Sequence, residues 1–426
     1  MQTSLLGIAN KAKSEKQYRF RNLYRELNEE LLIDSWRLLR KDAALGVDRV
    51  SAAEYETNLA ENVHQLVERL KRKSYRAKLV RRQYIPKGNG GRRPLGIPAT
   101  EDKLLQLAVK RLLEAIYEQD FLPCSWGYRP QLGARAAVEE LDRKLQFGGY
   151  HQVVEADIRG FFDNLSHEWL MRMLAERIED EPLLRLIKKW LNAGVLDTDG
   201  KVLRPESGTP QGGIISPVLA NVYLHYALDL WFERVFQRSC RGAAFLHRYA
   251  DDFVCGFGRA EEAERFYKEL AERLRKFGLE LAKDKTRVIP FSRYRQGETS
   301  FEFLGFEFRW GVDRQGRARL KRRTARKKLR NSVNRVAEWC RQNRHRRVRE
   351  QIQLLNAKLR GYCNYYGVIG NYASLDEFFY HVRRLHWKWL NRRSQRRSYT
   401  WEAYTELMRE LALERPRIVA HTKPAL

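Results

Sequence analysis

The sequence predicts an α+β protein in which strands and helices mix along most of the chain and helices fill its last part. Three observations predict this class. Alternating or apolar runs typical of strands lie at 151–158, 247–257 and 301–310. Apolar residues at spacings of three and four lie between these runs, and such spacings continue from residue 348 onward. At 426 residues, the chain is long enough for two or three subdomains.

The N-terminal part reads as helices followed by a hairpin. Residues 14–40 carry apolar side chains at near-helical spacing and predict a basic helical extension over 1–40, through Tyr18, Leu23, Leu27, Leu31 and Trp36. Ser51 follows a break and is expected to cap a helix that reaches about residue 72. Turn residues between two short apolar runs at 84–98 predict a hairpin with a basic tip.

The middle of the chain alternates strands and helices. In the strand that starts at 151, one face is expected to carry Val154, Ala156 and Ile158, and the other to carry Val153, Glu155 and Asp157. A helical stretch over 166–192 follows. A Gly/Pro-rich loop then leads into a long apolar helix within 207–236, and a later helix is expected to end at Gly278.

The chain after residue 308 has a different composition. Between 309 and 349 there are seventeen Lys and Arg residues against Asp313 and Glu338. Helical stripes follow and predict an antiparallel helical bundle. A solvated helix face usually mixes both signs of charge, so the nearly uniform sign favours a phosphate-binding surface.

The overall charge narrows the class of partner. The sequence has 81 Lys and Arg against 53 Asp and Glu, a net charge of +28, which indicates nucleic acid or an anionic membrane. An aromatic content of 12% favours nucleic acid, because aromatic rings stack on bases. A membrane partner has no amphipathic or lipidation signal behind it. Five scattered cysteines without a CxxC pair, and no apolar run near 18 residues, predict a soluble, reduced, cytoplasmic protein.

Three acids carry the candidate chemistry. "HRYADDFVCGF" at 247–257 places Asp251 and Asp252 in an apolar hairpin, and Asp157 ends another strand. Paired acids on a hairpin are often solvated turn residues, and YxDD alone is a weak signal. Three acids at strand ends, however, could converge on one side of a sheet. Carboxylates are the preferred ligands of Mg²⁺, and two such ions support in-line displacement at phosphorus.

Several blocks together resemble group II intron-encoded reverse transcriptase/maturases. In family order they are "VRRQYIPKGNGGRRPLGIP", "CSWGYRP", "ADIRGFFDNLSHEWL", "GTPQGGIISPVLANVYLH", "RYADDFVCGF", "LELAKDKTRV", "FEFLGF" and "LNAKLRGYCNYYG", spanning about 45–366. The resemblance implies a right-hand polymerase, with fingers and palm over 41–308, a maturase-specific helical thumb over 309–410 and a tail over 411–426. It also implies two Mg²⁺ ions, with Mn²⁺ as a substitute.

The resemblance assigns roles to individual residues. The expected metal ligands are Asp157, Ile158, Asp251 and Asp252. Lys285 resembles a lysine that protonates the departing pyrophosphate, with a surface lysine as the alternative reading. The residues expected around the nucleotide and the primer end are Lys87, Arg93, Phe162, Gln211 and Tyr249.

Each of these substrate residues has a role and an alternative. Phe162 looks like the steric gate against a ribose 2′-hydroxyl, and either it or Phe161 is expected to be core. Lys87 and Arg93 resemble the residues that hold the triphosphate, against ordinary loop charge. Gln211 resembles a lining residue of the nucleotide pocket, against a structural loop. Tyr249 is expected near the primer terminus, with Val254 and Phe257 holding the hairpin from behind.

The helical thumb is expected to bind RNA through phosphate contacts and shape. "FLGF" would form the primer grip, with phenylalanines that are more often core, and Tyr362 is also expected to be core. The expected nucleic-acid contacts are Arg322, Arg323, Arg326, Lys327, Arg330, Arg360, Asn364 and Tyr365. Little chain follows the last predicted helix and Cys363 is the last cysteine, so we expect no zinc-containing nuclease domain.

The resemblance implies an RNA-directed DNA polymerase that binds a group II intron RNA, assists its splicing and reverse transcribes it. Its expected partners are template RNA, intron RNA, a DNA primer or target and dNTPs, without a membrane or an obligatory protein partner. We expect a bacterial-type cytoplasmic protein held at the nucleoid through nucleic acid. Two alternatives remain: a reverse transcriptase of host defence or repair, and a maturase that has lost catalysis.

Overall fold

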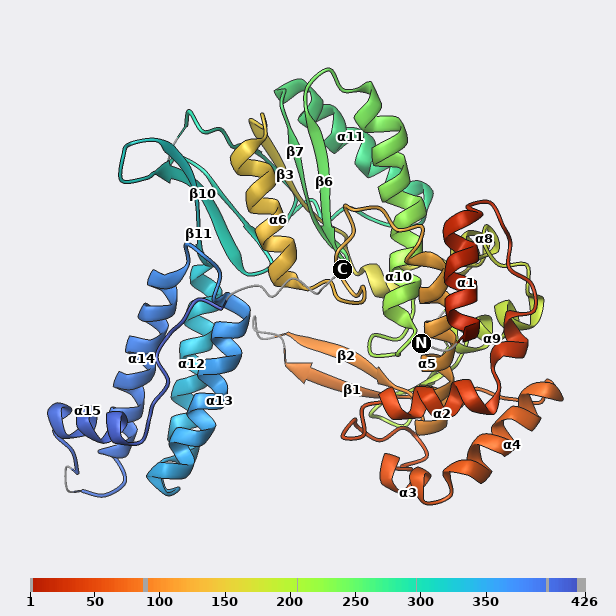
Figure 1. Cartoon of the computed structure of the whole chain (residues 1–426), viewed down its shortest axis with the longest axis horizontal. Helices are drawn as coiled ribbons and strands as arrows, with labels where there is room; N and C mark the ends of the chain where they lie inside the picture. Colours follow the sequence, from red (N-terminus) through yellow and green to blue (C-terminus); the bar gives the residue numbers. More distant parts are fainter. Residues whose placement is uncertain (1–2, 87–90, 205, 296, 396–397, 420–426) are drawn as a thin grey trace.

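Three β-sheets and the helices that surround them make up the computed structural model of the chain (Figure 1). The structure describes residues 3–86, 91–204, 206–295, 297–395 and 398–419. The C-terminal helices form a separate bundle beside the sheets (Figure 1). The predicted α+β class, with antiparallel sheets and a helical C-terminal part, is confirmed.

The N-terminal helices lie at other positions than predicted. The helical extension expected over 1–40 is divided into α1 (Thr3–Ser14), the short η1 (Leu23–Glu26) and α2 (Glu29–Leu38), and the spacing at 14–40 is interrupted between α1 and η1. The reason is a pairing that spacing does not reveal. Phe20 forms a β-bridge with Ile178: its N–H donates to the Arg177 carbonyl, and its carbonyl accepts from the Glu179 N–H. The chain around Phe20 is therefore extended and not helical. The apolar side chains of α1 and α2 enter the main core.

The sheet that contains the predicted hairpin, called the fingers sheet below after the expected architecture, has the strand order β2-β1-β4-β5. Its strands are β1 (Val80–Pro86), β2 (Arg92–Ile97), β4 (Val195–Leu196) and β5 (Val202–Leu203). The predicted hairpin is therefore present as β1 and β2, which pair from Arg81 with Ile97 to Pro86 with Arg92. Lys87 lies outside the described residues.

The helices before this sheet show why the sequence folds as it does. Ser51 caps α3 (Ala52–Thr57) as predicted, and Glu54 completes a capping box. The helix breaks at Asn58, however, and continues as α4 (Leu59–Lys71). After the hairpin, α5 (Thr100–Tyr117) runs through the main core, where most of its residues are buried.

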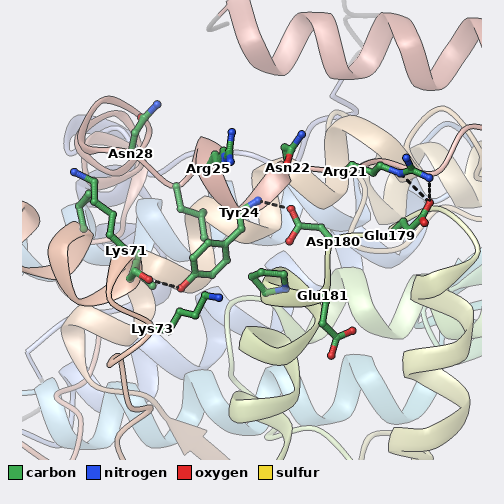
Figure 2. Close-up of a pocket in the computed structure, with 14 residues that line it drawn as sticks. Arg21, Asn22, Tyr24, Arg25, Asn28, Lys71, Lys73, Glu179, Asp180 and Glu181 are labelled. Atoms are coloured by element: carbon green, nitrogen blue, oxygen red, sulfur yellow. Dashed lines mark hydrogen bonds and ion pairs between the residues drawn. The ribbon is translucent and has the colours of Figure 1, made fainter.

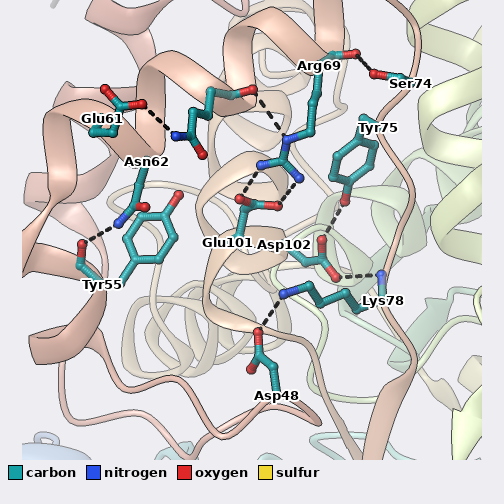
Figure 3. A network of polar contacts seen from close by, with 11 residues as sticks. Asp48, Tyr55, Glu61, Asn62, Arg69, Ser74, Tyr75, Lys78, Glu101 and Asp102 are labelled. Atoms are coloured by element: carbon teal, nitrogen blue, oxygen red, sulfur yellow. Dashed lines mark hydrogen bonds and ion pairs between the residues drawn. The ribbon is translucent and has the colours of Figure 1, made fainter.

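A polar network ties α4 and α5 to the base of the fingers sheet (Figure 3). Arg69 binds both carboxylate oxygens of Glu101, at 3.0 and 2.5 Å. Asp102 accepts hydrogen bonds from the Tyr75 hydroxyl (2.5 Å) and the Lys78 main-chain nitrogen (3.1 Å). Burial, the first cause, raises the pKa of Asp102 to about 6. The network fixes the segment that leads into β1.

The palm sheet is antiparallel, in the order β6-β7-β3-β8. Its strands are β3 (Gln152–Asp157), β6 (Ala244–Tyr249), β7 (Asp252–Phe257) and β8 (Arg287–Pro290). One face packs on the main core and the other on a second apolar cluster that includes α6 (Ala134–Phe147). Before β8 begins, residues 281–286 turn around Ala282, whose N–H donates to the Asp157 carbonyl and whose carbonyl accepts from Lys285 and Thr286.

The helices beside the palm differ in detail from prediction. The stretch 166–192 forms two helices, because Asp180 caps a new one. The long apolar helix starts as predicted but widens into two π-helical segments. Gly278, with φ +70°, ends its helix as predicted. These helices are α7 (Phe161–Asn164), α8 (His167–Ala175), α9 (Glu181–Leu191), α10 (Ser216–Leu224), η2 (His225–Asp229), η3 (Phe232–Phe236), η4 (Gln237–Ser239) and α11 (Ala260–Lys276).

A third sheet links the palm to the C-terminal bundle. Its order is β11-β10-β9, from β9 (Ser300–Phe303), β10 (Phe306–Val312) and β11 (Ala318–Thr324). Part of the basic segment is therefore a strand rather than a helix. The bundle contains α12 (Arg326–Asn343), α13 (Val348–Tyr366), α14 (Tyr372–Leu390) and α15 (Trp401–Glu410), the last of which the apolar stripes did not predict.

Two further findings concern general properties of the chain. Within the described ranges, no helix is both long and apolar enough to cross a membrane. All five cysteines are free thiols, and three of them are buried. Burial raises the pKa of the Cys340 thiol to about 12, so this thiol stays protonated.

Candidate active site

The hairpin of β6 and β7 presents two acids at its turn. Tyr249 pairs with Asp252, so Ala250 and Asp251 form a two-residue turn. Ala250 has φ +58°, a left-handed conformation that tight hairpin turns require and that alanine rarely adopts. Val254 and Phe257 are both fully buried, but on opposite faces of the sheet. The prediction that both support the hairpin from one side is therefore wrong, because strand neighbours alternate.

The third acid lies beside this turn. Asp157 ends β3 and is the register partner of Asp252 across the β3–β7 pair. The predicted alternation is present, since Val154, Ala156 and Ile158 enter the main core on the other face. Ile158 is a core residue with an apolar side chain, so its main-chain carbonyl is the one group it could offer to a cation. The fold thus brings together acids that are 94 positions apart in the sequence.

Burial and neighbouring charges raise the pKa values of Asp251 and Asp252. Burial, then the charges of Asp251 and Asp157, raise the pKa of Asp252 to about 7. Burial also raises the pKa of Asp251, and Asp157 contributes to the rise. Holding several carboxylates ionised in one partly buried place costs free energy, which a bound cation would offset.

Lys285 supplies one cation at this place. Its Nζ lies 2.5 Å from Oδ2 of Asp157, and the Lys285 side chain is 64% exposed. The hydrogen bond to Asp157 is the first cause that raises the pKa of Lys285. Lys285, the predicted proton donor, therefore lies beside Asp157, one of the three candidate metal-binding acids.

The acids fit divalent metal only in part as they stand. Within the described residues, no three His, Cys, Asp or Glu side chains are grouped closely enough to hold an ion. Two observations nevertheless favour a cation: the raised pKa values of Asp251 and Asp252, to which burial and neighbouring acids contribute, and the ammonium of Lys285 that binds Asp157. Hard carboxylate oxygens suit Mg²⁺, which keeps several waters and needs few protein ligands.

Arg93 extends the site toward the fingers. It lies in β2, is exposed, and lines a cavity of about 580 Å³ together with Asp157, Asp252 and Lys285. Its charge lowers the pKa of Asp251 against the stronger effect of burial. A guanidinium that lines the same cavity as these carboxylates is placed to bind a phosphate group there.

A second cavity, of about 480 Å³, lies between the fingers sheet and the start of α7. Phe162 and Gln211 both line it, together with Arg82 and Gly96. Phe161 is 2% exposed and belongs to the main core. One of the two phenylalanines is therefore core, as predicted, but the reason is a helical turn at 161–164 and not strand alternation.

The loop that carries Gln211 is held by close main-chain contacts. Gly96 donates its N–H to the Gln211 carbonyl (2.6 Å), and Thr209 donates to the Phe162 carbonyl (2.8 Å). Gly212 has φ +110°, and a Cβ there would lie 2.8 Å from the Gly96 oxygen. Glycine is needed at this position for both its conformation and its lack of a side chain.

The cavity of about 580 Å³ that Arg93 lines also reaches the predicted primer grip. Leu304 and Gly305 form the turn between β9 and β10, and both line this cavity. The Tyr365 hydroxyl donates to the Leu304 carbonyl (3.0 Å), so α13 is tied to this turn. Phe303 and Phe306, the phenylalanines of "FLGF", are buried as core residues. Tyr249 lies half-buried against the same cluster.

The predicted RNA-contacting residues fall into two groups. Arg322 is engaged by Asp142 (3.5 Å) and the Ile369 carbonyl (3.0 Å) with its side chain 9% exposed, and Arg323 binds Glu307. Arg360 is exposed and pairs with Glu414. Tyr362 stacks on Phe378 within the bundle, at 3.8 Å between centroids. The remaining candidates are exposed: Arg326, Lys327, Arg330, Asn364 and Tyr365.

Another cavity, of about 790 Å³, is lined by none of the three acids Asp157, Asp251 and Asp252 (Figure 2). It is lined by basic residues of the N-terminal segment and of α4, and by Glu179–Glu181. Much of its charge is already paired: Arg21 binds Glu179, and Asp180 accepts from the Tyr24 main chain. Its three acids are already engaged, Glu179 by Arg21, Asp180 by the Tyr24 main chain and Glu181 by Arg185, so the cavities at the palm remain the candidate sites.

Several residues at the site were missed by sequence reasoning. Glu155, Glu302 and Lys328 line the cavity of Arg93. Strand alternation puts Glu155 on the face of Asp157, so this one could have been found. Glu302 and Lys328 come from β9 and α12, and only the folded chain places them there.

Comparison with protein families decides the class. A model described as "Reverse transcriptase (RNA-dependent DNA polymerase)" matches residues 85–308. This range contains the three acids and also Arg93, Phe162 and Gln211. The chain belongs to the reverse transcriptase family. A second model, "Group II intron, maturase-specific domain", matches residues 327–407, so this reverse transcriptase carries that domain on α12 to α15. The family generally uses divalent metal ions.

Curated relatives point the same way. "Group II intron-encoded protein LtrA" of Lactococcus lactis subsp. cremoris is 30% identical over 404 residues, 75% of this chain and 66% of the relative. "Protein YkfC" of Escherichia coli K12 is 32% identical over 316 residues, 67% of this chain and 81% of the relative. The "Uncharacterized 91 kDa protein in cob intron" of Schizosaccharomyces pombe is 34% identical over 217 residues, which are 50% of this chain and 26% of that protein. The chain thus spans just under two thirds of LtrA and a quarter of the fission-yeast protein.

Proposed function

We propose that this reverse transcriptase adds dNTPs to a primer 3′-end on an RNA template by two-metal nucleotidyl transfer. The observation that carries the proposal is the register that sets Asp157 beside Asp252 and the Asp251 turn, under Arg93 of the fingers. A dead polymerase that kept its fold would have no need to hold like charges together here.

The residues at the site have separate tasks in this reaction. Arg93 binds and orients the triphosphate, assisted by Lys87. Phe162 and Gln211 line the place of the sugar and base, and the ring of Phe162 excludes a 2′-hydroxyl. Lys285 delivers a proton from Nζ to the departing pyrophosphate, and Tyr249 contacts the primer terminus. Asp157 and Asp251 hold the metal ions, with Asp252 and the carbonyl of Ile158 completing the site.

Bound Mg²⁺ supplies activation of the primer 3′-hydroxyl and charge neutralisation on the phosphates, and Mn²⁺ is a substitute. On this proposal, Asp157 would release Lys285 when it binds a metal ion. The Lys285 ammonium is largely solvated, so releasing it from Asp157 costs little, and it is then free to meet the leaving phosphate. The two roles of Lys285, ion pair and proton donor, therefore follow one another.

We further propose that the partner of the C-terminal domain is a group II intron RNA, whose splicing the protein assists. The support is the maturase-specific match and the similarity to a protein named as encoded by such an intron. Exposed cations of α12 and the exposed Asn364 and Tyr365 of α13 would contact phosphates and unpaired bases. On this proposal the chain divides into 1–40, fingers and palm 41–308, thumb 309–410 and tail 411–426, and it acts in the bacterial cytoplasm at the nucleoid.

The polymerase proposal is tested by extension of a DNA primer on an RNA template with the purified chain. Wild type should extend the primer with dNTPs and Mg²⁺, and Asp251→Asn should lose extension. Asp199→Asn is the matched control, because Asp199 lies in an exposed turn where it pairs with Lys201. Extension by Asp251→Asn at the rate of Asp199→Asn would overturn the two-metal assignment.

The intron proposal is tested by sequencing the RNA that co-purifies with the chain. A folded group II intron RNA should be enriched, and its splicing at low Mg²⁺ should depend on the protein. Enrichment of an unrelated RNA, with splicing unaffected, would favour the alternative of a defence or repair enzyme. Deleting α12–α15 should abolish RNA enrichment only in the first case.

A further inference from the structure

The turn that presents Asp251 is bound from behind by one buried side chain. Arg248 precedes the turn by two residues and is fully buried. Its Nη1 donates to the carbonyl of Ala250 (2.9 Å), the residue with the left-handed conformation. Such a conformation persists only where the surroundings enforce it. Arg248 is therefore in direct contact with the strained position of the candidate catalytic hairpin.

All five N–H donors of Arg248 have acceptors. Nε and Nη2 bind the two carboxylate oxygens of Asp229, at 2.8 and 2.5 Å, and neither side chain of this pair is exposed. Nη1 also donates to Asn221 Oδ1 (3.1 Å), and Nη2 to Ser125 Oγ (2.7 Å). A guanidinium has five donors in a fixed plane, so its orientation here is fully determined.

The acceptors come from separate parts of the fold. Asp229 is the last residue of the π-helical segment η2, and Asn221 lies about two turns earlier, in α10. A π-helical turn inserts a residue and so changes which side chain faces the sheet. Asn221 Nδ2 also donates to the carbonyl of Gly127 (2.7 Å). Gly127 packs so closely on the turn that a Cβ there would lie 2.3 Å from the Ala250 nitrogen.

A buried ion pair is a poor means of stabilising a fold. Desolvation of both charges commonly cancels their attraction, and well-packed apolar residues stabilise as much or more. What a satisfied guanidinium adds is geometry: a planar set of contacts that holds one carbonyl in one place. Here that carbonyl belongs to the residue immediately before Asp251.

We propose that Arg248 and Asp229 are positioning residues that hold the Ala250–Asp251 turn, so that the Asp251 carboxylate stays directed toward Asp157. The proposal rests on the proposed polymerase function for its effect on rate, but not for the contact itself. Neither residue touches substrate. Arg248 acts through the Ala250 carbonyl, and Asp229 acts by fixing Arg248.

The decisive variant is Arg248→Lys. Lysine keeps the charge, but a single ammonium on a flexible stem cannot bind the Asp229 carboxylate and the Ala250 carbonyl in the same plane. Arg177→Lys is the matched control. The Arg177 side chain is 4% exposed, pairs with Asp120 (2.9 Å), and donates to the carbonyls of Ala12 in α1 and of Glu15 just after it.

Two readouts are measured on the full chain. The first is amide hydrogen exchange of the peptide that covers residues 247–257, which needs no activity. It should exchange at least about tenfold faster in Arg248→Lys than in wild type, and be unchanged in Arg177→Lys. The second is the dependence of primer extension on Mg²⁺ concentration. Arg248→Lys should need several-fold more Mg²⁺ for half-maximal rate and lose at least about tenfold in kcat, with the KM for primer–template unchanged.

The outcomes separate this proposal from the polymerase assignment. If wild type does not extend primers, the proposed function fails, while hydrogen exchange still decides whether Arg248 holds the turn. If wild type extends primers and Arg248→Lys matches Arg177→Lys in exchange, Mg²⁺ dependence and kcat, the positioning proposal is overturned. Should Arg248→Lys fail to fold, Asp229→Asn serves instead. It keeps an acceptor oxygen of the same shape, and should show the same changes to a smaller extent.

Discussion

Replacing Gly208 with alanine should disturb Phe162 through the main chain, without touching its ring. Gly208 has φ +86°, and a Cβ there would lie 2.8 Å from the Phe162 oxygen and 2.7 Å from the Asp163 oxygen. Both contacts are with main-chain atoms, so they cannot be relieved by rotating a side chain. The turn that carries the expected steric gate must move instead.

The size of the effect has two parts. Forcing alanine into a left-handed conformation costs about 1–2 kcal/mol of folding free energy. Gly200 provides the control for this part, because it has φ +84° and open space around its Cβ position. The remaining part belongs to the clash. A shift of the Phe162 main chain by a few tenths of an ångström up to about 1 Å predicts a loss of about 10- to 100-fold in dNTP incorporation.

The assay compares kcat/KM for a dNTP and for the matching rNTP on an RNA template. Gly200→Ala should lose stability and keep wild-type kinetics and selectivity. Gly208→Ala should lose dNTP efficiency and, because the gate is displaced, a larger share of its discrimination against rNTPs. Equal kinetics and selectivity in the two variants would refute the link between this loop and Phe162.

Three more predictions follow from the same structure. Phe162→Val should raise rNTP incorporation by at least about tenfold, whereas Phe161→Leu should lower the unfolding temperature and leave selectivity unchanged; equal selectivity in both would contradict the gate. His386 is buried between Tyr404 and Gln351, and burial lowers its pKa to about 4. His386 binds a proton more tightly in the unfolded chain than in the folded one, so the free energy of unfolding should fall by up to about 3 kcal/mol as the pH drops from 6.5 toward 4. Denaturant unfolding at each pH measures this fall. The same pH dependence in His386→Gln as in wild type would contradict the assignment. Neutralising the exposed cations Arg326, Lys327 and Arg330 should lower the salt dependence of RNA binding. The slope of the logarithm of the binding constant against the logarithm of the salt concentration should fall by about 0.7–0.9 for each lost phosphate contact. An unchanged slope would exclude these residues from the interface.

Local patterns predicted those parts of the site that a single element determines. Alternation along β3 placed Asp157 opposite the core face, and the hairpin followed from apolar runs around the YADD turn. The helix ended at Gly278 because glycine alone enters that conformation without strain. In each case the physical cause lies within a few residues.

Long-range pairing decided what the sequence could not predict. Arg248 is buried in a charged state because Asp229 reaches it from a π-helical segment, and no local signal marks such a segment. The N-terminal helix ended early because Phe20 pairs with Ile178, far along the chain. Arg322 lies on a strand and binds Asp142, although its basic neighbourhood predicted a helix facing RNA.

The central claim is that acids from β3 and from the β6–β7 turn act as one metal-binding site. Its most direct test is single-turnover extension of a DNA primer on an RNA template by Asp157→Asn, across a range of Mg²⁺ concentrations. The account predicts a loss of extension as complete as in Asp251→Asn, although 94 positions separate the two residues. Wild-type extension by Asp157→Asn at any Mg²⁺ concentration would contradict it.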